Sequence, residues 1–167
     1  MTACTNNSEL KDDDQKSIQA LVGVWRGAGD YQGQEDEGWS ENWKITRHAD
    51  GTFEVQYLLV NDVKKEYELT TDHGKWSYEN GRYLEVSSND EQSVYKVYSL
   101  KKDWFEYNFI QRGDDVTIQE TKTVDNYQLQ EPPEGYSKYV NQKFVVPNEE
   151  QRASASDLIK NQAEAEK

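Results

Sequence analysis

Two histidines, one cysteine and 32 acidic residues are the side chains that could do chemistry in this chain. His48 and His73 each stand beside a predicted turn, where an imidazole is usually solvated. Neighbouring acids such as Glu35 and Asp36 could move protons, but so many acids make such pairs commonplace. No motif for a nucleophilic serine or cysteine, or for a phosphate-binding loop, accompanies them. The sequence therefore predicts neither an enzyme nor a metal or cofactor site.

Cys4 is the cysteine, and its neighbours suggest lipid attachment. Small residues, Thr2 and Ala3, precede it and a polar run follows, as at the end of a bacterial lipoprotein signal. On this interpretation residues 1–17 are a flexible tether, and the lipid at Cys4 holds the protein in the periplasm or at the outer membrane. The alternative is a chance cysteine in a leader. No run of about 18 apolar residues is present, so membrane contact is expected only through this anchor.

The middle of the chain alternates apolar and polar residues in short segments separated by Gly, Asn and Asp turns. Phe53, Val55, Tyr57 and Leu59 share one face of the clearest segment, 52–59. Further strands are predicted near 23–29, 40–48, 63–71, 74–79, 82–88, 92–100, 103–111 and 115–123. The connections are short and contain residues that favour tight turns, such as Asn80-Gly81 and Gly113-Asp114. Sequential strands should therefore pair as an antiparallel meander.

Such a meander with an aromatic interior is expected to close, because closure removes the exposed edges of an open sheet. We predict an all-β fold: an up-and-down antiparallel barrel of about 8–10 strands over residues 18–147, with short helical terminal segments. One helical turn near Ile18, Leu21 and Val22 is expected to plug one end. Residues 148–167 form a polar tail, either helical or disordered.

Alternation also predicts which side chains line the barrel. The candidate ligand-binding residues are aromatic: Trp25, Trp43, Phe53, Tyr57, Tyr67, Trp76, Tyr95, Tyr107 and Phe109. The hydroxyl groups of the tyrosines among them would suit an amphipathic ligand. Arg26 and Arg47 could pair with an anionic head group, or with acids on the surface.

The formal net charge of -13 excludes one class of partner. Nucleic acid carries a dense negative charge and would be repelled. Most of this charge falls within the predicted barrel, where it favours solubility.

The first strand opens with Gly23-Val24-Trp25, which resembles the Gly-x-Trp start of lipocalins in the calycin superfamily. The segment from Arg47 to Phe53, then Gly74-Lys75-Trp76, and Tyr95 through Leu100 resemble a bacterial lipocalin-like domain family whose members are often periplasmic lipoproteins. The glycines at 23, 27 and 29 around Trp25 are similar to those of nitrobindin-like barrels, which would imply haem. Those barrels hold iron through a histidine near the C-terminal end, and no histidine follows His73 here.

Two functions follow from this resemblance and the aromatic interior. The first is a binding protein of the bacterial cell envelope that holds a small apolar or amphipathic molecule inside the barrel. The alternative is a filled barrel that acts as a protein-interaction module. Its contacts would be Trp39, Trp43 and the segment 131–136. A haem-binding barrel is the third and weakest hypothesis.

Overall fold

The computed structural model describes residues 13–30, 38–110 and 117–139, and within them strands predominate. A helix covers residues 13–21, so residues 13–17 of the expected tether are helical. The strands are β1 (Gly23–Asp30), β2 (Trp39–Arg47), β3 (Thr52–Asn61), β4 (Glu66–Glu79), β5 (Arg82–Ser87), β6 (Gln92–Lys101), β7 (Trp104–Phe109), β8 (Thr117–Thr123) and β9 (Ser137–Lys138). Cys4, the predicted turn Gly113-Asp114 and the tail 148–167 lie outside the described residues. No helix in the described ranges is long and apolar enough to cross a membrane.

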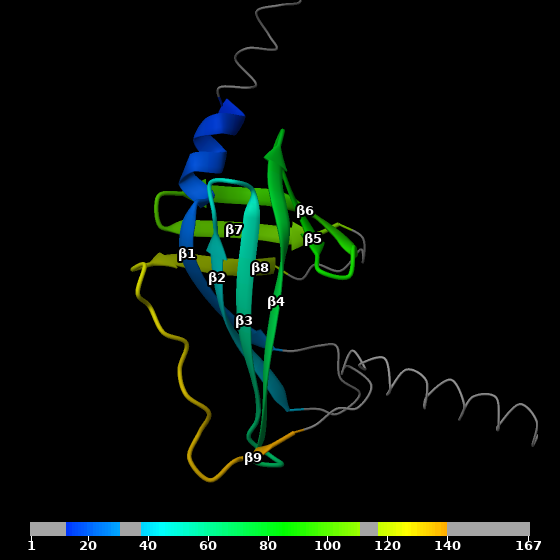
Figure 1. The fold of residues 1–167 in the computed structure, drawn as a ribbon, viewed down its shortest axis with the longest axis vertical. Coiled ribbons are helices and arrows are strands. Elements are labelled where there is room, and N and C mark those ends of the chain that lie inside the picture. Colours follow the sequence, from blue (N-terminus) through cyan, green and yellow to red (C-terminus); the bar gives the residue numbers. More distant parts are fainter. Residues whose placement is uncertain (1–12, 31–37, 111–116, 140–167) are drawn as a thin grey trace, which may run out of the picture.

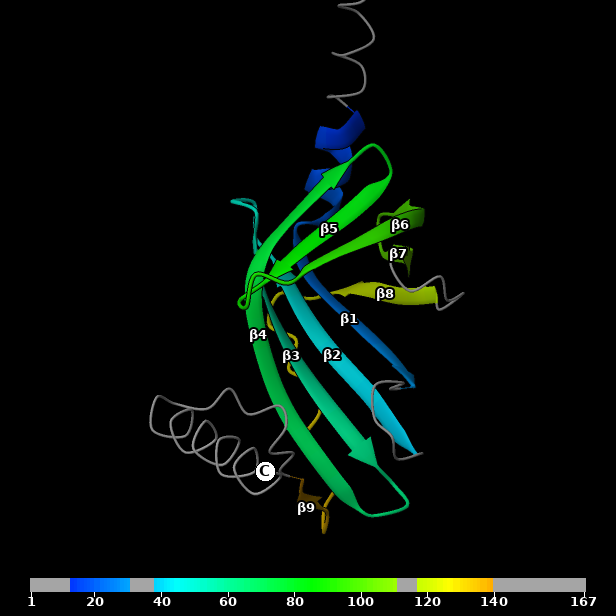
Figure 2. The ribbon, with the colours of Figure 1, turned by 90° about the vertical axis from the view of Figure 1, so that its right-hand side faces the viewer.

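The first eight strands form an antiparallel sheet that closes on itself (Figures 1 and 2). Each pairs with its neighbour in the chain, β1 also pairs with β8, and the β3–β4 pairing completes the ring. The short β9 adds a parallel pairing to β4. Asn80 and Gly81 have φ values of 51° and 74° in the turn between β4 and β5, as a tight hairpin requires. The structure thus confirms the prediction of an up-and-down barrel.

β4 corrects the expected strand boundaries, because the segments predicted at 63–71 and 74–79 belong to one 14-residue strand. Its first part pairs with β3 and its last part with β5. Gly74 lies where the two ladders meet, opposite both Phe53 and Ser87. A Cβ atom there would stand 1.9 Å from the carbonyl oxygen of Val86. The glycine therefore permits close strand contact and does not mark a turn.

The helix of residues 13–21 stands at one end of the barrel (Figure 1), and its last turn packs against the core through Ile18 and Leu21. Leu21 and Trp25 are fully buried there, and the Trp25 indole donates a hydrogen bond of 2.9 Å to the Leu21 carbonyl oxygen. Trp25 also meets the edge of the Phe105 ring, with 6.2 Å between ring centroids. At this end the barrel interior is a solid core.

Candidate functional site in the barrel interior

The predicted aromatic residues divide into distinct groups in the structure. Trp25, Trp43, Phe53, Trp76 and Tyr107 belong to one buried core cluster, and Tyr57 and Tyr95 pack against it. Of these residues, Trp43, Tyr57, Tyr95 and Tyr107 also line a cavity. Phe109 packs against the Tyr95 ring, with 5.2 Å between ring centroids, but is not one of the residues that line the cavity.

Tyr67 requires a correction, because it does not face the interior. It is paired with Val60, whereas Tyr57, which faces inward, is paired with Thr70. Because successive side chains of a strand point to opposite faces, Tyr67 and Thr70 lie on opposite faces of β4. Near the β3–β4 turn, the inward positions of β4 are occupied by polar residues, Glu66, Glu68 and Thr70. Alternation of apolar residues therefore indicated the wrong face.

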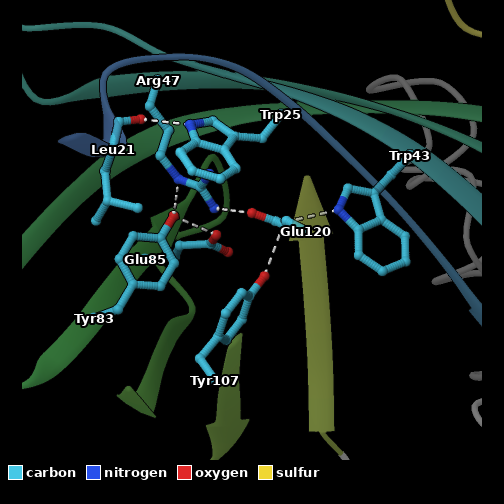
Figure 3. Close-up of polar contacts among 8 residues, drawn as sticks. All are labelled: Leu21, Trp25, Trp43, Arg47, Tyr83, Glu85, Tyr107 and Glu120. Carbon is cyan, nitrogen blue, oxygen red and sulfur yellow. Dashed lines mark hydrogen bonds and ion pairs between the residues drawn. The ribbon is translucent and has the colours of Figure 1, made fainter. Parts of the chain in front are cut away.

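A buried hydrogen-bond network crosses the middle of the barrel and joins strands that are distant in sequence (Figure 3). Glu120 on β8 is its centre. One carboxylate oxygen accepts from the Arg47 guanidinium at 2.8 Å, and the other accepts from the Trp43 indole at 2.8 Å and the Tyr107 hydroxyl at 2.9 Å. These donors satisfy both oxygens of a side chain that is only 1% exposed.

Arg47 extends the network toward β5. Its Nε donates to the Tyr83 hydroxyl at 2.8 Å, and that hydroxyl donates to Glu85 at 2.6 Å. The guanidinium carbon also lies 4.8 Å from the Tyr83 ring centroid and 5.3 Å from that of Phe105. Burial opposes the charge on Arg47, but Glu120, Tyr83 and Tyr107 outweigh it and keep the pKa of Arg47 above its usual value.

Beyond this network the interior is hollow. The cavity has a volume of about 150 Å³, comparable to a cavity that accepts one benzene molecule. Its wall consists of aromatic and aliphatic side chains with three carboxylates: Glu41, Trp43, Ile45, Val55, Tyr57, Glu85, Tyr95, Tyr107, Ile118 and Glu120. The barrel is thus filled at the helix end and hollow beyond Arg47 and Glu120.

Two of the three carboxyl groups in this cavity, those of Glu41 and Glu85, have fewer hydrogen-bond donors than Glu120. Glu85 accepts one hydrogen bond, from Tyr83, and its burial raises its pKa. Glu41 has no hydrogen-bond or ion-pair partner in the described part of the chain, and loss of hydration raises its pKa to about 7. The cavity therefore contains two carboxyl groups that lack the direct ion pair of Glu120.

Tyr57 stands on the cavity wall among these acids. Burial, followed by the fields of Glu85 and Glu41, raises the pKa of its hydroxyl well above the usual value. This hydroxyl has no hydrogen-bond partner among the described residues. It is a polar group that a cavity ligand could reach.

The hypotheses about Arg26 and Arg47 are both corrected. Arg47 is fully buried and already paired with Glu120, so it is neither a surface residue nor a free cation. Arg26 is exposed on the outer face, where it lies 5.5 Å from the ring centroid of Tyr127. Neither side chain directs an unpaired positive charge into the cavity.

Other predicted contacts also lie elsewhere. Trp39 and Trp43, proposed as surface contacts of an interaction module, are both buried, and Trp39 packs against Tyr139 with 5.2 Å between ring centroids. His48 and His73 are exposed, on positions outside the cavity wall. Neither histidine is placed to bind a haem held inside the barrel.

A second hollow, of about 320 Å³, lies on the outer wall of the barrel. The outward side chains of β1 and β8 form one side, and Tyr127, Leu129 and Gln130 of the following segment form the other. Trp43 contributes to both hollows, whereas Trp104 and Tyr127 belong only to the outer one. These residues allow the two hollows to be distinguished experimentally.

Sequence reasoning missed Glu41, Tyr83, Glu85 and Glu120 as interior residues. A signal was present in the alternation, because Glu41 shares its face of the strand with Trp43 and Ile45, and Glu120 shares its face with Ile118. Charged side chains are rarely buried without a partner, and the sequence shows no partner for these residues. They were therefore not predicted to be interior residues, although alternation places them on the inward face. Their partners come from other strands, which only the closed barrel brings together.

Comparison with known proteins agrees with this architecture. A family model described as a lipocalin-like domain matches residues 21–107, more than half of the chain and most of the barrel. No curated protein matches the chain. The matched region includes Gly23-Val24-Trp25 and ends at Tyr107, before the strand that carries Glu120. The chain therefore belongs to the lipocalin-like domain family.

Proposed function

We propose that this domain is a binding protein without catalytic activity, which holds one small molecule in the hollow half of its barrel. The cavity lined by Trp43, Tyr57, Tyr95 and Tyr107 carries the proposal. Its wall combines aromatic and aliphatic side chains with carboxyl and hydroxyl groups that could fix the orientation of a small molecule. Its volume of about 150 Å³ suits a ligand with a single ring or a short alkyl chain.

The polar network supports this role by separating the core from the cavity. Arg47, Tyr83 and Glu120 are each no more than 1% exposed, and the rings of Phe105 and Tyr107 stack with 4.4 Å between centroids. Rigid walls reduce the entropy lost when a ligand binds. We expect a site that is formed before the ligand arrives.

Three one-ring probes of similar size test this function: benzylamine, benzyl alcohol and benzoate. Each is titrated against a Trp104→Phe variant, in which the tryptophan confined to the outer hollow is removed, and tryptophan fluorescence is recorded. The proposal predicts a saturable change with at least one probe, because Trp43 lies on the cavity wall.

Two adjacent residues of β8 supply the matched controls. Ile118→Phe fills the interior cavity, whereas Gln119→Phe adds the same ring to the outer hollow. Binding should be lost in the first variant and retained in the second. The proposal is wrong if no probe binds, or if only Gln119→Phe prevents binding.

We also propose that the domain works in the bacterial cell envelope, attached through a lipid at Cys4. The small residues before Cys4 and the polar run after it support this localisation. The test is expression of the full-length gene with labelled palmitate, comparing the natural sequence with Cys4→Ser. Label should enter only the natural protein and remain with the membrane fraction. Equal labelling of both proteins, or none of either, would contradict the anchor.

A further inference from the structure

The balance of charge inside the barrel indicates what kind of small molecule the cavity accepts. Three carboxylates line it, those of Glu41, Glu85 and Glu120. The guanidinium of Arg47, 2.8 Å from Glu120, already neutralises one of them. Lys122 lies toward the helix end, where it donates to the Ala20 carbonyl oxygen at 3.4 Å and stands 5.7 Å from the Trp25 ring centroid. Among the described residues Glu41 therefore has no cation beside it, and Glu85 has only the field of the same Arg47, which reaches it through the Tyr83 hydroxyl.

The walls between these carboxylates are aromatic. Tyr57, Tyr95, Tyr107 and Trp43 surround the cavity, and the Tyr95 and Tyr107 rings meet edge to face with 4.9 Å between centroids. The face of an aromatic ring carries partial negative charge and attracts ammonium groups. The aromatic rings and the carboxylates thus favour the same sign of charge.

Tyr57 provides an independent polar contact. Its hydroxyl, largely buried and without a partner among the described residues, lies in the fields of Glu41, Glu85 and Glu120. A phenolic oxygen can accept a hydrogen bond from an N–H group. An ammonium group near Tyr57 would find this acceptor in the cavity that Glu41 and Glu85 also line.

We propose that the ligand of this cavity is a small organic cation, an ammonium group joined to an apolar body of about the size of one aromatic ring. This inference rests on the proposed function, since it names the chemical class that the interior site accepts. A metal ion fits less well, because no group of three or more His, Cys, Asp or Glu residues in the described ranges is arranged to hold one. An anionic ligand would face the carboxylates of Glu41 and Glu85 directly.

The test compares benzylamine with benzyl alcohol, which have nearly the same shape and differ in charge. Affinities are measured by titration calorimetry at pH 8. Benzylamine should bind about 10-fold more tightly, in keeping with the strength of a desolvated cation–π contact. Benzoate should bind more weakly than either compound. Calcium chloride at the same concentration should leave benzylamine bound.

Two variants locate the effect. Glu41→Gln and Glu85→Gln should each weaken benzylamine binding several-fold and leave benzyl alcohol binding unchanged. Glu54→Gln is the control, since it removes the same charge from a side chain that is 74% exposed. It should change neither affinity. Thermal unfolding of each variant shows that it is folded.

The possible failures can be told apart. If benzyl alcohol binds as tightly as benzylamine and Ile118→Phe abolishes both, the cation assignment is wrong and the proposed function stands. If calcium displaces benzylamine, the site is for a metal ion and the assignment is wrong. If no probe binds, both the assignment and the proposed function fail.

Discussion

Glu120 determines how the polar interior of the barrel is organised. Its two oxygens accept hydrogen bonds from Arg47, Trp43 and Tyr107, which lie on two strands. Burial of a carboxylate costs desolvation free energy, and the hydrogen bonds from these donors offset that cost. The three donors are in turn fixed in orientation, so the same contacts shape one wall of the cavity.

Loss of one member of the Arg47–Glu120 pair should destabilise the fold more than loss of both. Glu120→Gln removes the ion-pair partner of the buried Arg47 guanidinium, and we expect a loss of about 3–5 kcal/mol in the free energy of unfolding. In Arg47→Met/Glu120→Gln the buried charge is gone, and the glutamine can still accept from Trp43 or Tyr107. Urea unfolding of the two single variants and the double variant measures the coupling. Additive losses would show that the pair is not energetically coupled.

Glu41 should make the stability of the protein depend on pH. Its folded-state pKa of about 7 lies above the ordinary value of 4.5. Between these values the folded protein binds more protons than the unfolded chain, so this contribution to stability is lost as pH rises from about 5 to 8. Because the side chain is partly exposed, we expect less than about 3 kcal/mol. Glu85 and Glu120 face the same cavity, and Glu85 adds a slope of the same sign.

Glu41→Gln isolates this contribution. Unfolding free energies measured at pH 5 and pH 8 should fall less in Glu41→Gln than in the wild type. Glu79→Gln, which replaces an exposed carboxylate, serves as the comparison. Parallel pH profiles for wild type and Glu41→Gln would refute the role assigned to Glu41.

One glycine of the first strand, Gly27, is required by a close contact with the second strand. Gly27 is paired with Trp43, and a Cβ atom on Gly27 would stand 2.1 Å from the Trp43 ring. The missing side chain provides the space in which the indole lies and reaches Glu120. Gly29, two residues later, has no atom within 4 Å of the position where its Cβ would be.

These two glycines predict contrasting substitutions. Gly27→Ala should displace the Trp43 ring and lower the free energy of unfolding by about 1–3 kcal/mol. It should also alter the near-ultraviolet circular dichroism of the buried tryptophan. Gly29→Ala should change stability by no more than about 0.5 kcal/mol. Equal effects of the two substitutions would mean that contact with Trp43 is not the reason for Gly27.

Much of the element pattern could be predicted from the sequence because alternation and turn residues are local signals. They identified most of the strands, the hairpin at Asn80-Gly81 and the apolar plug near Leu21. They failed at β4, where Gly74 resembled a turn but allows two ladders to meet in one strand. They also failed at Tyr67, because the side chains facing inward near the β3–β4 turn are polar.

At the scale of the whole molecule the barrel has two unlike halves. The half near the helix is a packed core around Trp25 and Phe105, and the other half contains the acidic, aromatic cavity. The sequence predicted the aromatic walls at Trp43, Tyr57, Tyr95 and Tyr107. It could not reveal the cavity or its excess of acidic groups, because both depend on residues of six strands that meet only after the barrel closes.

The overall charge of the protein agrees with the polarity of its cavity. A net charge of -13 attracts cations toward the molecule and increases their rate of encounter. From composition alone this acidity indicates solubility. It also favours the approach of a small organic cation, the class of ligand proposed for the cavity.

The most direct test of ligand binding inside the barrel is a ¹³C–¹H spectrum of protein labelled in the tyrosine rings and titrated with benzylamine. Tyr57 and Tyr95 line only the inner cavity, and Tyr127 lines only the outer hollow. Binding inside the barrel should give saturable shifts of the Tyr57 and Tyr95 ring signals while that of Tyr127 stays in place. Shifts confined to Tyr127, or no shifts at any of these rings, would contradict it.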